Sequence, residues 1–336
     1  MGKRIGKFIL LFLGIGLLVI AYFFFIAPAP QKKPIIWGVN FSQAHAESLT
    51  LDWKETFLAI MDDLGAREVK LLPQWDWIQG DRDSFYFDDV DWQLQEAEKR
   101  QAKIIYVVGM KTGRWPECHV PLWAEKLPKK EQQEELLKYV AVVVNHYKDN
   151  PTIIAWQAEN EPLFRFGICP WYDADFLKEE VDLIKSIDPS RPVIVSDTGE
   201  QSLWLRAGRI GDIVGTTLYR KVWLHITDKV GFNINIPLSP GSYWFKAKLI
   251  EILYGKKVIN VELQAEPWAS VVFYEVPLKE QEKTMNLTQF KSNIQYARDT
   301  GLERFYLWGV EWMYWMKEIQ NRPEIWNEAQ KLFLEN

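Results

Sequence analysis

Cysteine and histidine are scarce in this chain of 336 residues. The two cysteines, Cys118 and Cys169, are too few for a disulfide framework or a zinc site. The four histidines, which include His45 and His119, show no spacing typical of metal ligands. We therefore expect no metal site.

An excess of positive charge is also missing. The net charge is -5 and the pI is near 5.6, so the chain lacks the basic footprint of a nucleic-acid-binding protein, and nucleic acid is not an expected partner. No glycine-rich phosphate loop follows the first expected strand, which argues against a bound nucleotide, and we expect no cofactor. A hydrophobic share of 48% excludes a disordered chain and allows one large domain or two small ones.

A long apolar run stands near the N-terminus. Residues 1–7 are basic, and residues 8–26 are uncharged over about the ~20 residues that span a bilayer. A cleaved signal peptide is the alternative, but its apolar region is usually shorter, and proline stands beside each candidate cleavage position. We expect an uncleaved transmembrane anchor with residues 1–7 in the cytoplasm, a stiff proline-rich linker at 27–34, and a catalytic domain at 35–336 outside the cytoplasm.

The rest of the chain alternates short apolar runs with amphipathic helical stretches, which is typical of repeated βα units and a parallel sheet. The expected strands are residues 35–41, 68–72, 103–108, 152–156, 192–195, 212–218, 257–261 and 304–307. The expected helices are residues 53–64, 88–100, 131–147, 174–187, 243–253, 287–300 and 323–334, and residues 220–242 form the longest expected loop. Eight strands predict an α/β fold of the (β/α)8 or TIM barrel type, with a doubly wound open sheet as the alternative.

Polar residues follow the fourth expected strand, just before Pro162, which ends the strand because it has no N–H to donate. The carboxyl ends of barrel strands carry the chemistry, so we expect Glu161 to face the mouth of the barrel. Glu262 ends the seventh strand, and Glu266, further from that strand, is the alternative. Two carboxyl groups that face each other are the minimal machinery for glycoside hydrolysis.

This pattern resembles the clan A glycoside hydrolases, which include cellulases, mannanases and β-galactosidases. The resemblance rests on Asn160-Glu161-Pro162 after a strand that contains Trp156, on Glu262 about a hundred residues later, and on Tyr219 and Trp308 at the ends of strands six and eight. It implies that Glu161 is the acid/base and Glu262 the nucleophile.

The resemblance also implies the groups that hold the sugar. Asn160 would bind the sugar 2-hydroxyl, Tyr219 would bond the nucleophile, and Trp308 would form the floor under the reacting sugar. Two positions depart from the usual pattern. Lys70 stands where the clan usually has an arginine, so it would act as a point charge, and Thr217 stands where many members have histidine.

Further candidates for substrate binding lie at other strand ends. Asn40 lies near the end of the first strand. Tryptophan serves as a flat platform for sugar faces and also fills cores, and both interpretations stay open for each one. The tryptophans in strand-end segments are Trp75, Trp77, Trp115, Trp171 and Trp268.

The two cysteines fall in loops after neighbouring strands, Cys118 after the third and Cys169 after the fourth. In a barrel both loops lie at the same face, so we expect a disulfide that ties them together outside the cytoplasm. Two free buried thiols are the alternative.

Together these features predict a membrane-anchored glycosidase outside the cytoplasm that cleaves β-linked sugars of an oligo- or polysaccharide with retention. Its partners are then the substrate and, through residues 8–26, the lipid bilayer. Retention requires carboxyl groups about 5–5.5 Å apart, and the pKa of Glu161 should be raised by the neighbouring Glu262 anion. The alternatives are a carbohydrate-binding barrel without turnover and a transglycosylase that remodels surface glycans.

Overall fold

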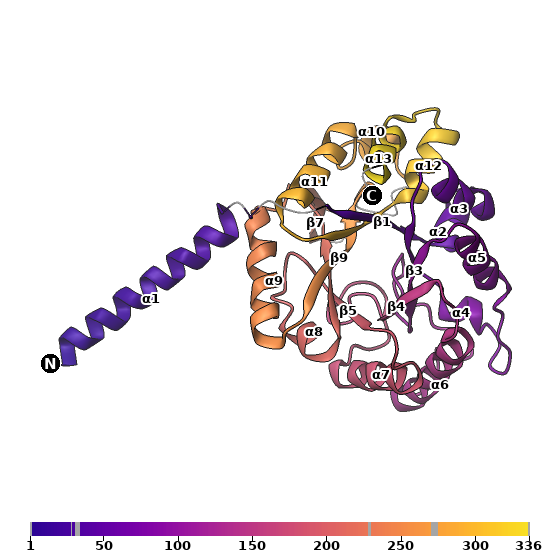
Figure 1. Cartoon of the computed structure of the whole chain (residues 1–336), viewed down its shortest axis with the longest axis horizontal. Coiled ribbons are helices and arrows are strands. Elements are labelled where there is room, and N and C mark those ends of the chain that lie inside the picture. Colours follow the sequence, from indigo (N-terminus) through magenta and orange to yellow (C-terminus); the bar gives the residue numbers. More distant parts are fainter. Residues whose placement is uncertain (1, 28, 31–33, 228–229, 270–274, 335–336) are drawn as a thin grey trace.

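The computed structural model describes residues 2–27, 29–30, 34–227, 230–269 and 275–334. Eight parallel strands close into a barrel in the order β1-β10-β9-β6-β5-β4-β3-β2, and helices surround it (Figure 1). The barrel strands are β1 (Ile36–Phe41), β2 (Glu68–Leu71), β3 (Lys103–Val108), β4 (Ile153–Ala158), β5 (Val193–Asp197), β6 (Ile213–Leu218), β9 (Lys257–Gln264) and β10 (Arg304–Trp308). The predicted barrel is confirmed, and the open-sheet alternative is wrong.

The helices agree with the amphipathic stretches of the sequence and add several short ones. They are α1 (Gly2–Phe25), α2 (Gln43–Ser48), α3 (Trp53–Asp62), α4 (Trp75–Ile78), α5 (Asp88–Lys99), α6 (Lys129–Tyr147), α7 (Ala174–Ile187), α8 (Leu205–Ile210), α9 (Pro240–Tyr254), α10 (Leu278–Gln281), α11 (Leu287–Asp299), α12 (Val310–Glu318) and α13 (Glu324–Phe333). The short helices α2, α4, α8 and α10 lack the length over which an apolar period becomes visible in a sequence.

Two layers of side chains stabilise the barrel, because successive residues of a strand point to opposite faces. The inner cluster consists of Ile105, Ala155, Ile194, Val261 and Tyr306. Residues next to these in sequence point outward to the helices. Tyr106 packs on Tyr147 of α6 with ring centroids 5.4 Å apart, and the Trp156 indole N–H donates to Asp188 over 2.9 Å. Both faces of the sheet are thus buried, which explains the continuous apolar runs.

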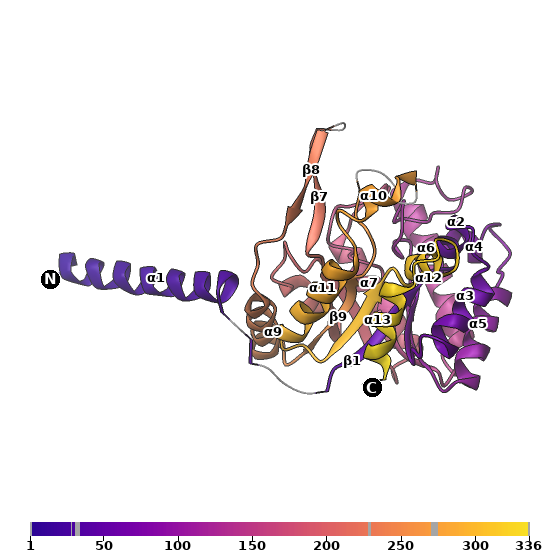
Figure 2. The ribbon, with the colours of Figure 1, turned by 90° about the horizontal axis from the view of Figure 1, so that it is seen from above.

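The prediction that residues 220–242 form a loop is wrong. The chain there forms an antiparallel hairpin of β7 (Lys221–Thr227) and β8 (Val230–Asn235). Figure 2 shows the hairpin projecting away from the barrel. The sequence carried a signal that the prediction passed over, because apolar residues alternate along both strands and Val222 and Leu224 pair with Ile234 and Phe232.

The predicted N-terminal helix is present as α1, which projects from the barrel (Figure 1). Its C-terminal end contacts α9, where the Phe23 ring lies 5.8 Å from that of Trp244 and 5.6 Å from that of Phe245. Among the residues that the structure describes, no helix is long and apolar enough to cross a membrane. The predicted membrane-spanning anchor at residues 8–26 is therefore not supported.

Candidate active site

The backbone at the end of β4 turns two consecutive polar side chains toward the mouth of the barrel. Glu159 and Glu161 have positive φ angles of 57° and 45°, in the left-handed region that non-glycine residues rarely adopt. The Glu159 carboxylate points away and accepts hydrogen bonds from the backbone N–H groups of Met110 and Lys111. Asn160 and Glu161 both contact residues at the mouth. Backbone strain of this kind concentrates at functional sites.

A β-bulge directs Glu262 to the same place. Thr216 of β6 pairs with Asn260 of β9, but Thr217 pairs with Glu262, so Val261 is skipped in the register. Val261 packs inside the barrel, and strict alternation would send the next side chain outward to the helices. The bulge turns the Glu262 side chain back to the mouth, and Glu262 is only 2% exposed there.

The end of β6 and the residue after it supply one hydroxyl to each carboxylate. The Tyr219 hydroxyl donates to Glu262 Oε2 over 2.7 Å, and the Thr217 hydroxyl donates to Glu161 Oε1 over 3.0 Å. The backbone N–H of Glu161 donates to Ser196 Oγ over 2.8 Å, which fixes the turn after β4. Both carboxyl groups are therefore held by the same stretch of β6, on the side of the mouth between β4 and β9.

Lys70 is the cation of this group. Its residue is fully buried, and its Nζ lies 3.0 Å from Asn160 Oδ1 and 3.5 Å from Glu262 Oε1. The same Nζ lies 5.8 Å from the centre of the Trp308 ring. Burial lowers the pKa of Lys70, and the nearby Glu262 carboxylate opposes that shift. Lys70 thus contacts Glu262 from the second strand with a single point charge.

The two carboxyl groups differ in their electrostatics. Burial raises the pKa of Glu161 well above its ordinary value, and the Glu262 anion raises it further, against the effect of Lys111. The upward direction predicted from the sequence is confirmed. Burial also raises the pKa of Tyr219, and the Glu262 anion adds to that shift, so the hydroxyl stays a donor. A third carboxyl group, Glu117, has its pKa raised to about 7 by burial.

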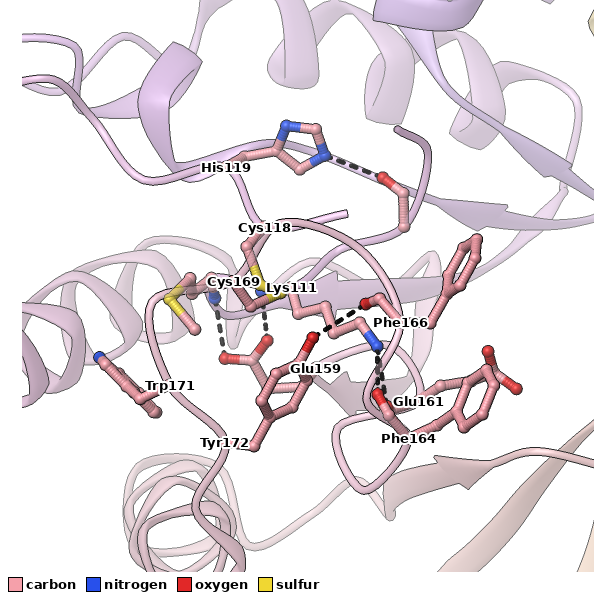
Figure 3. The surroundings of a disulfide bond; sticks show 12 residues. Lys111, Cys118, His119, Glu159, Glu161, Phe164, Phe166, Cys169, Trp171 and Tyr172 are labelled. Carbon is pink, nitrogen blue, oxygen red and sulfur yellow. Dashed lines mark hydrogen bonds between the residues drawn. A yellow bond between two sulfur atoms is a disulfide. The ribbon is translucent and has the colours of Figure 1, made fainter. Parts of the chain in front are cut away.

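A disulfide ties the loops after β3 and β4, because Cys118 and Cys169 form the predicted pair. Figure 3 shows the Lys111 side chain beside this bond, with its amine directed at the backbone of the second loop. The Lys111 Nζ donates to the carbonyl oxygens of Glu161 and Phe164, each over 3.0 Å. The loop after β3 thereby holds the backbone that carries Glu161.

The same loop carries a second ionic group, centred on Arg114. Its guanidinium contacts the Glu266 carboxylate through Nη1 and lies 2.8 Å from Glu311 Oε2 through Nη2. His45 Nε2 lies 3.2 Å from the other oxygen of Glu266. The Arg114 guanidinium also lies 4.2 Å from the centre of the Trp308 ring. Glu266 is thus fully engaged in ion pairs, although it was the alternative to Glu262.

The structure corrects two of the predicted substrate-binding residues. Asn40 is fully buried, and its Nδ2 donates to the carbonyl oxygens of Val261 and Leu307 over 3.0 and 3.2 Å. It joins barrel strands below the mouth. Trp75 is fully buried, and its Nε1 donates to Gln79 over 2.8 Å. Both side chains serve the core, because both are fully buried and their N–H groups donate to acceptors within the protein.

The other tryptophans differ in placement. Trp308 is 7% exposed at the end of β10, near both Lys70 and Arg114. The Trp268 ring lies 5.0 Å from that of Tyr219, at the edge of the carboxylate site. Trp115 is exposed and its ring lies 6.4 Å from that of Phe166. Trp171 donates its Nε1 to Gln132 and packs beside α6.

Sequence reasoning missed several charged residues at the mouth: Lys111, Arg114, Glu117, Glu200 and Glu311. Arg114 and Glu117 lie in the loop after β3, and that position alone was a signal for charged groups near the carboxylates. Nothing local marked Glu200, which accepts from the backbone N–H of Tyr219 over 2.7 Å. Within the described residues, no group of His, Cys, Asp or Glu side chains is arranged to hold a metal ion.

Fold and site together define a class: a closed parallel α/β barrel whose mouth holds two buried carboxyl groups, from β4 and β9, with hydroxyl groups and a lysine as partners. No model of a known protein family matches the sequence. No curated protein matches it either.

Comparison with solved structures finds glycoside hydrolase barrels. An endo-β-1,4-xylanase of family 10 from Gloeophyllum trabeum has a TM-score of 0.59 at 13% identity, over 90% of this chain and 96% of that chain. An endo-β-1,4-mannanase from Thermotoga petrophila has a TM-score of 0.57 at 17% identity, over 90% of this chain and 77% of that chain. A β-galactosidase from Marinomonas ef1 has a TM-score of 0.54 at 13% identity, over 89% of this chain and 59% of that chain. At these identities the likeness establishes the fold.

Proposed function

We propose that the protein is a clan A glycoside hydrolase that cleaves β-glycosidic bonds with retention. The observation that carries the proposal is the unequal pair at the mouth. Glu161 has a raised pKa, whereas Glu262 accepts from Tyr219 and contacts the Lys70 amine. A carboxyl group with a raised pKa beside one that is held by a hydroxyl group and an amine matches the acid and the nucleophile of a double displacement.

In the first step Glu161 donates its proton to the glycosidic oxygen while a Glu262 oxygen attacks the anomeric carbon. The bond to the leaving group breaks, and a covalent glycosyl-enzyme forms. In the second step the Glu161 carboxylate takes a proton from water, the water oxygen attacks the anomeric carbon, and Glu262 is released. The Tyr219 hydroxyl and the Lys70 amine stabilise the Glu262 anion before attack and after release.

Asn160 is the proposed contact for the sugar 2-hydroxyl. The Lys70 amine and the Gln157 amide both donate to its Oδ1, so the side chain has a fixed orientation. Trp308 and Trp268 are the proposed apolar walls, because both lie beside residues of the carboxylate pair. Trp115 is proposed as a more distant platform on the loop after β3.

The test is a panel of aryl β-glycosides together with β-1,4-linked xylan and mannan, which the neighbouring enzymes are named for. Release of phenol and a first-formed sugar of β configuration in proton NMR are expected. Inverted product would refute retention, as would a crystallographic carboxyl separation near 9 Å, since inversion needs ~6.5–9.5 Å. Sugar binding without release by the native protein would support a silent carbohydrate-binding barrel instead. Sugar transfer to an added acceptor in preference to water would indicate a transglycosylase.

We also propose that the domain works outside the cytoplasm. The disulfide between Cys118 and Cys169 supports this placement, because such bonds persist in oxidising compartments. The basic residues 1–7 ahead of the apolar run at 8–26 support it from the sequence alone. Protease digestion of intact cells should remove the domain, and alkylation of the native protein without reductant should modify neither cysteine.

A further inference from the structure

A groove lies on the rim of the barrel mouth, apart from the carboxylate pair, where α2, α4 and the start of α5 come together. These three helices lie on the same side of the barrel in both views (Figures 1 and 2). Its volume is about 280 Å³, close to the lower end of the ~300–1,000 Å³ of small-molecule sites. We call it the rim groove; its walls include Phe41, Gln43, Gln74, Trp77, Tyr86 and Asp89.

Two large aromatic side chains of the rim groove are open to solvent. Trp77 is 43% exposed and Tyr86 is 55% exposed, whereas Trp75, two residues before Trp77, is fully buried. The backbone N–H of Tyr86 donates to the carbonyl of Ile78 over 2.8 Å, so the loop after α4 folds back on the helix that carries Trp77. The Tyr86 hydroxyl donates to Asp81 over 3.1 Å, which holds the ring in place. Ordered, exposed aromatic rings of this kind suit the apolar faces of sugar rings.

The polar groups between these rings are amides and carboxylates. Gln43 donates to Asp89 over 2.8 Å and accepts from Gln93 over 3.2 Å, so these side chains are oriented before any ligand arrives. Asp88 and Asp89 add two carboxylates, and none of the described residues that line the rim groove is lysine or arginine. This lining offers hydrogen-bond acceptors to hydroxyl or ammonium groups and repels a sugar that carries a carboxylate.

The rim groove adjoins the loop that contacts the candidate active site. Gln74 in its wall lies 3.4 Å from His119 between Nε2 atoms, and His119 Nε2 lies 2.9 Å from the carbonyl oxygen of Gly113. Gly113 in turn packs against Trp308 and Asn160, because a Cβ built on it would lie 3.0 and 3.2 Å from their side chains. The aromatic and polar groups of the rim groove are therefore separated from the carboxylate site only by the loop after β3, and a bound polymer could contact both.

We propose that the rim groove binds units of a neutral or amino-sugar oligosaccharide outside the reaction centre, and that it selects against uronic acids. The identity of this ligand as part of the substrate chain rests on the proposed glycosidase function. Binding itself does not, because the groove shares none of its lining residues with the carboxylate pair. Trp77 and Tyr86 stack on the sugar faces, and Gln43 and the carboxylates bond its hydroxyl or ammonium groups.

The experiment measures binding apart from turnover. Full-length Glu161→Gln protein is titrated calorimetrically with the hexasaccharides of cellulose, xylan, mannan and chitin, and with a galacturonate hexamer as the anionic probe. At least one neutral or amino-sugar hexamer should bind. Trp77→Ala in this background should weaken that binding by about ten-fold or more, Tyr86→Ala by less, and Trp77→Phe least of all, because truncating a central aromatic contact dominates such sites.

The matched control is Leu253→Ala, which removes an exposed apolar side chain on α9, on the other side of the barrel (Figure 1). It should leave binding within about two-fold of the parent, a change too small to signify a lost contact. Far-ultraviolet circular dichroism of each variant checks folding. If Trp77→Ala and Tyr86→Ala are folded and bind like the parent, if none of the hexamers binds, or if the galacturonate hexamer binds best, the proposal is wrong.

A parallel assay separates this proposal from the proposed function. With an otherwise native chain, Trp77→Ala should lose at least about five-fold more kcat/KM on the bound hexamer than on an aryl monoglycoside, which is too short to reach the rim groove. An equal loss on both substrates would overturn the proposal. If the native protein hydrolyses neither substrate but the calorimetric differences hold, the glycosidase function fails and the rim groove stands.

Discussion

Two pairs of buried carboxyl groups occupy the mouth of the barrel, and their surroundings are opposite. Glu262 has the Lys70 amine beside it, and each carboxyl group of this pair accepts from one hydroxyl group. Burial and the Glu262 anion raise the pKa of Glu161. Glu266 and Glu311 share Arg114, which bonds both at once. Burial works to raise the pKa of Glu266, but Arg114 and His45 hold it below its ordinary value.

The difference in surroundings suits the first pair to catalysis and the second pair to a structural role. A carboxyl group that keeps its proton near neutral pH can act as a general acid, whereas an ion-paired carboxylate cannot. Arg114 reaches Glu266 just after β9 and Glu311 at the start of α12, so the second pair joins the loop after β3 to two other parts of the barrel. The cations of both pairs, Lys70 and Arg114, lie near Trp308, and proximity to that ring alone would not have told the pairs apart.

The largest expected effect concerns which pair carries the activity, the pair with Glu262 or the pair with Glu266. Glu262→Ala should reduce kcat/KM on an aryl β-glycoside by more than about 10⁴-fold, because it removes the covalent route and not only a proton-transfer group worth ~10²–10⁴-fold. Glu266→Gln, in contrast, should lower the stability of the protein more than its kcat/KM. Initial rates and thermal unfolding of both variants provide the measurement. Full activity in folded Glu262→Ala would contradict the assignment.

The next largest effect concerns the second pair. Arg114→Met should lower the free energy of unfolding by about 3–5 kcal/mol, because it leaves two buried carboxylates without their cation. Adding Glu266→Gln should restore part of that loss, since a neutral amide needs no cation. Urea unfolding of the two single variants and the double variant measures the coupling. Additive losses would mean that Arg114 and Glu266 do not stabilise each other.

The disulfide tethers the loop that carries Arg114, so its removal should affect both pairs. The double variant Cys118→Ser with Cys169→Ser should lose about 2–4 kcal/mol of unfolding free energy, because the bond constrains the unfolded chain across a separation of 51 residues. Activity should fall as well, since Lys111 and Arg114 are on the tethered loop. Differential scanning calorimetry with and without reductant checks the first point. Reductant should change the native protein but not the double variant.

The smallest effect tests the electrostatics of Glu161 directly. As the general acid of the first step, Glu161 must be protonated, so kcat/KM should fall as pH rises through its raised pKa. Thr217→Val removes a hydrogen bond that favours the ionised form, so the pKa of Glu161 should rise and the alkaline fall in kcat/KM should move to higher pH. The rate at the optimum should change by less than about ten-fold, as expected for one hydrogen bond.

Glu161→Gln is the control for that pH profile. An amide does not titrate, so the alkaline fall should disappear in this variant. If the fall persists unchanged, another group, such as Glu117 with its pKa of about 7, is the source.

Much of the fold was open to sequence reasoning. Eight apolar runs that alternate with amphipathic helices determined the barrel, because burial on both faces of a parallel sheet leaves a continuous signal. The short helices left no comparable signal, and the alternating apolar residues of the hairpin of β7 and β8 were overlooked. Trp75 and Asn40 were misjudged because a residue type at a strand end does not reveal whether its partner is a ligand or another group of the protein.

The sequence by itself determined the eight units and the presence of carboxyl groups at the ends of β4 and β9. Only the tertiary structure decided which of them face the mouth. Alternation along β9 would have turned Glu262 outward after the inward Val261, and the bulge against β6 reverses it. Left-handed backbone angles do the same for Glu161. Local residue preferences predict neither the bulge nor these backbone angles, because the two features depend on register with a neighbouring strand or on contacts with a distant loop.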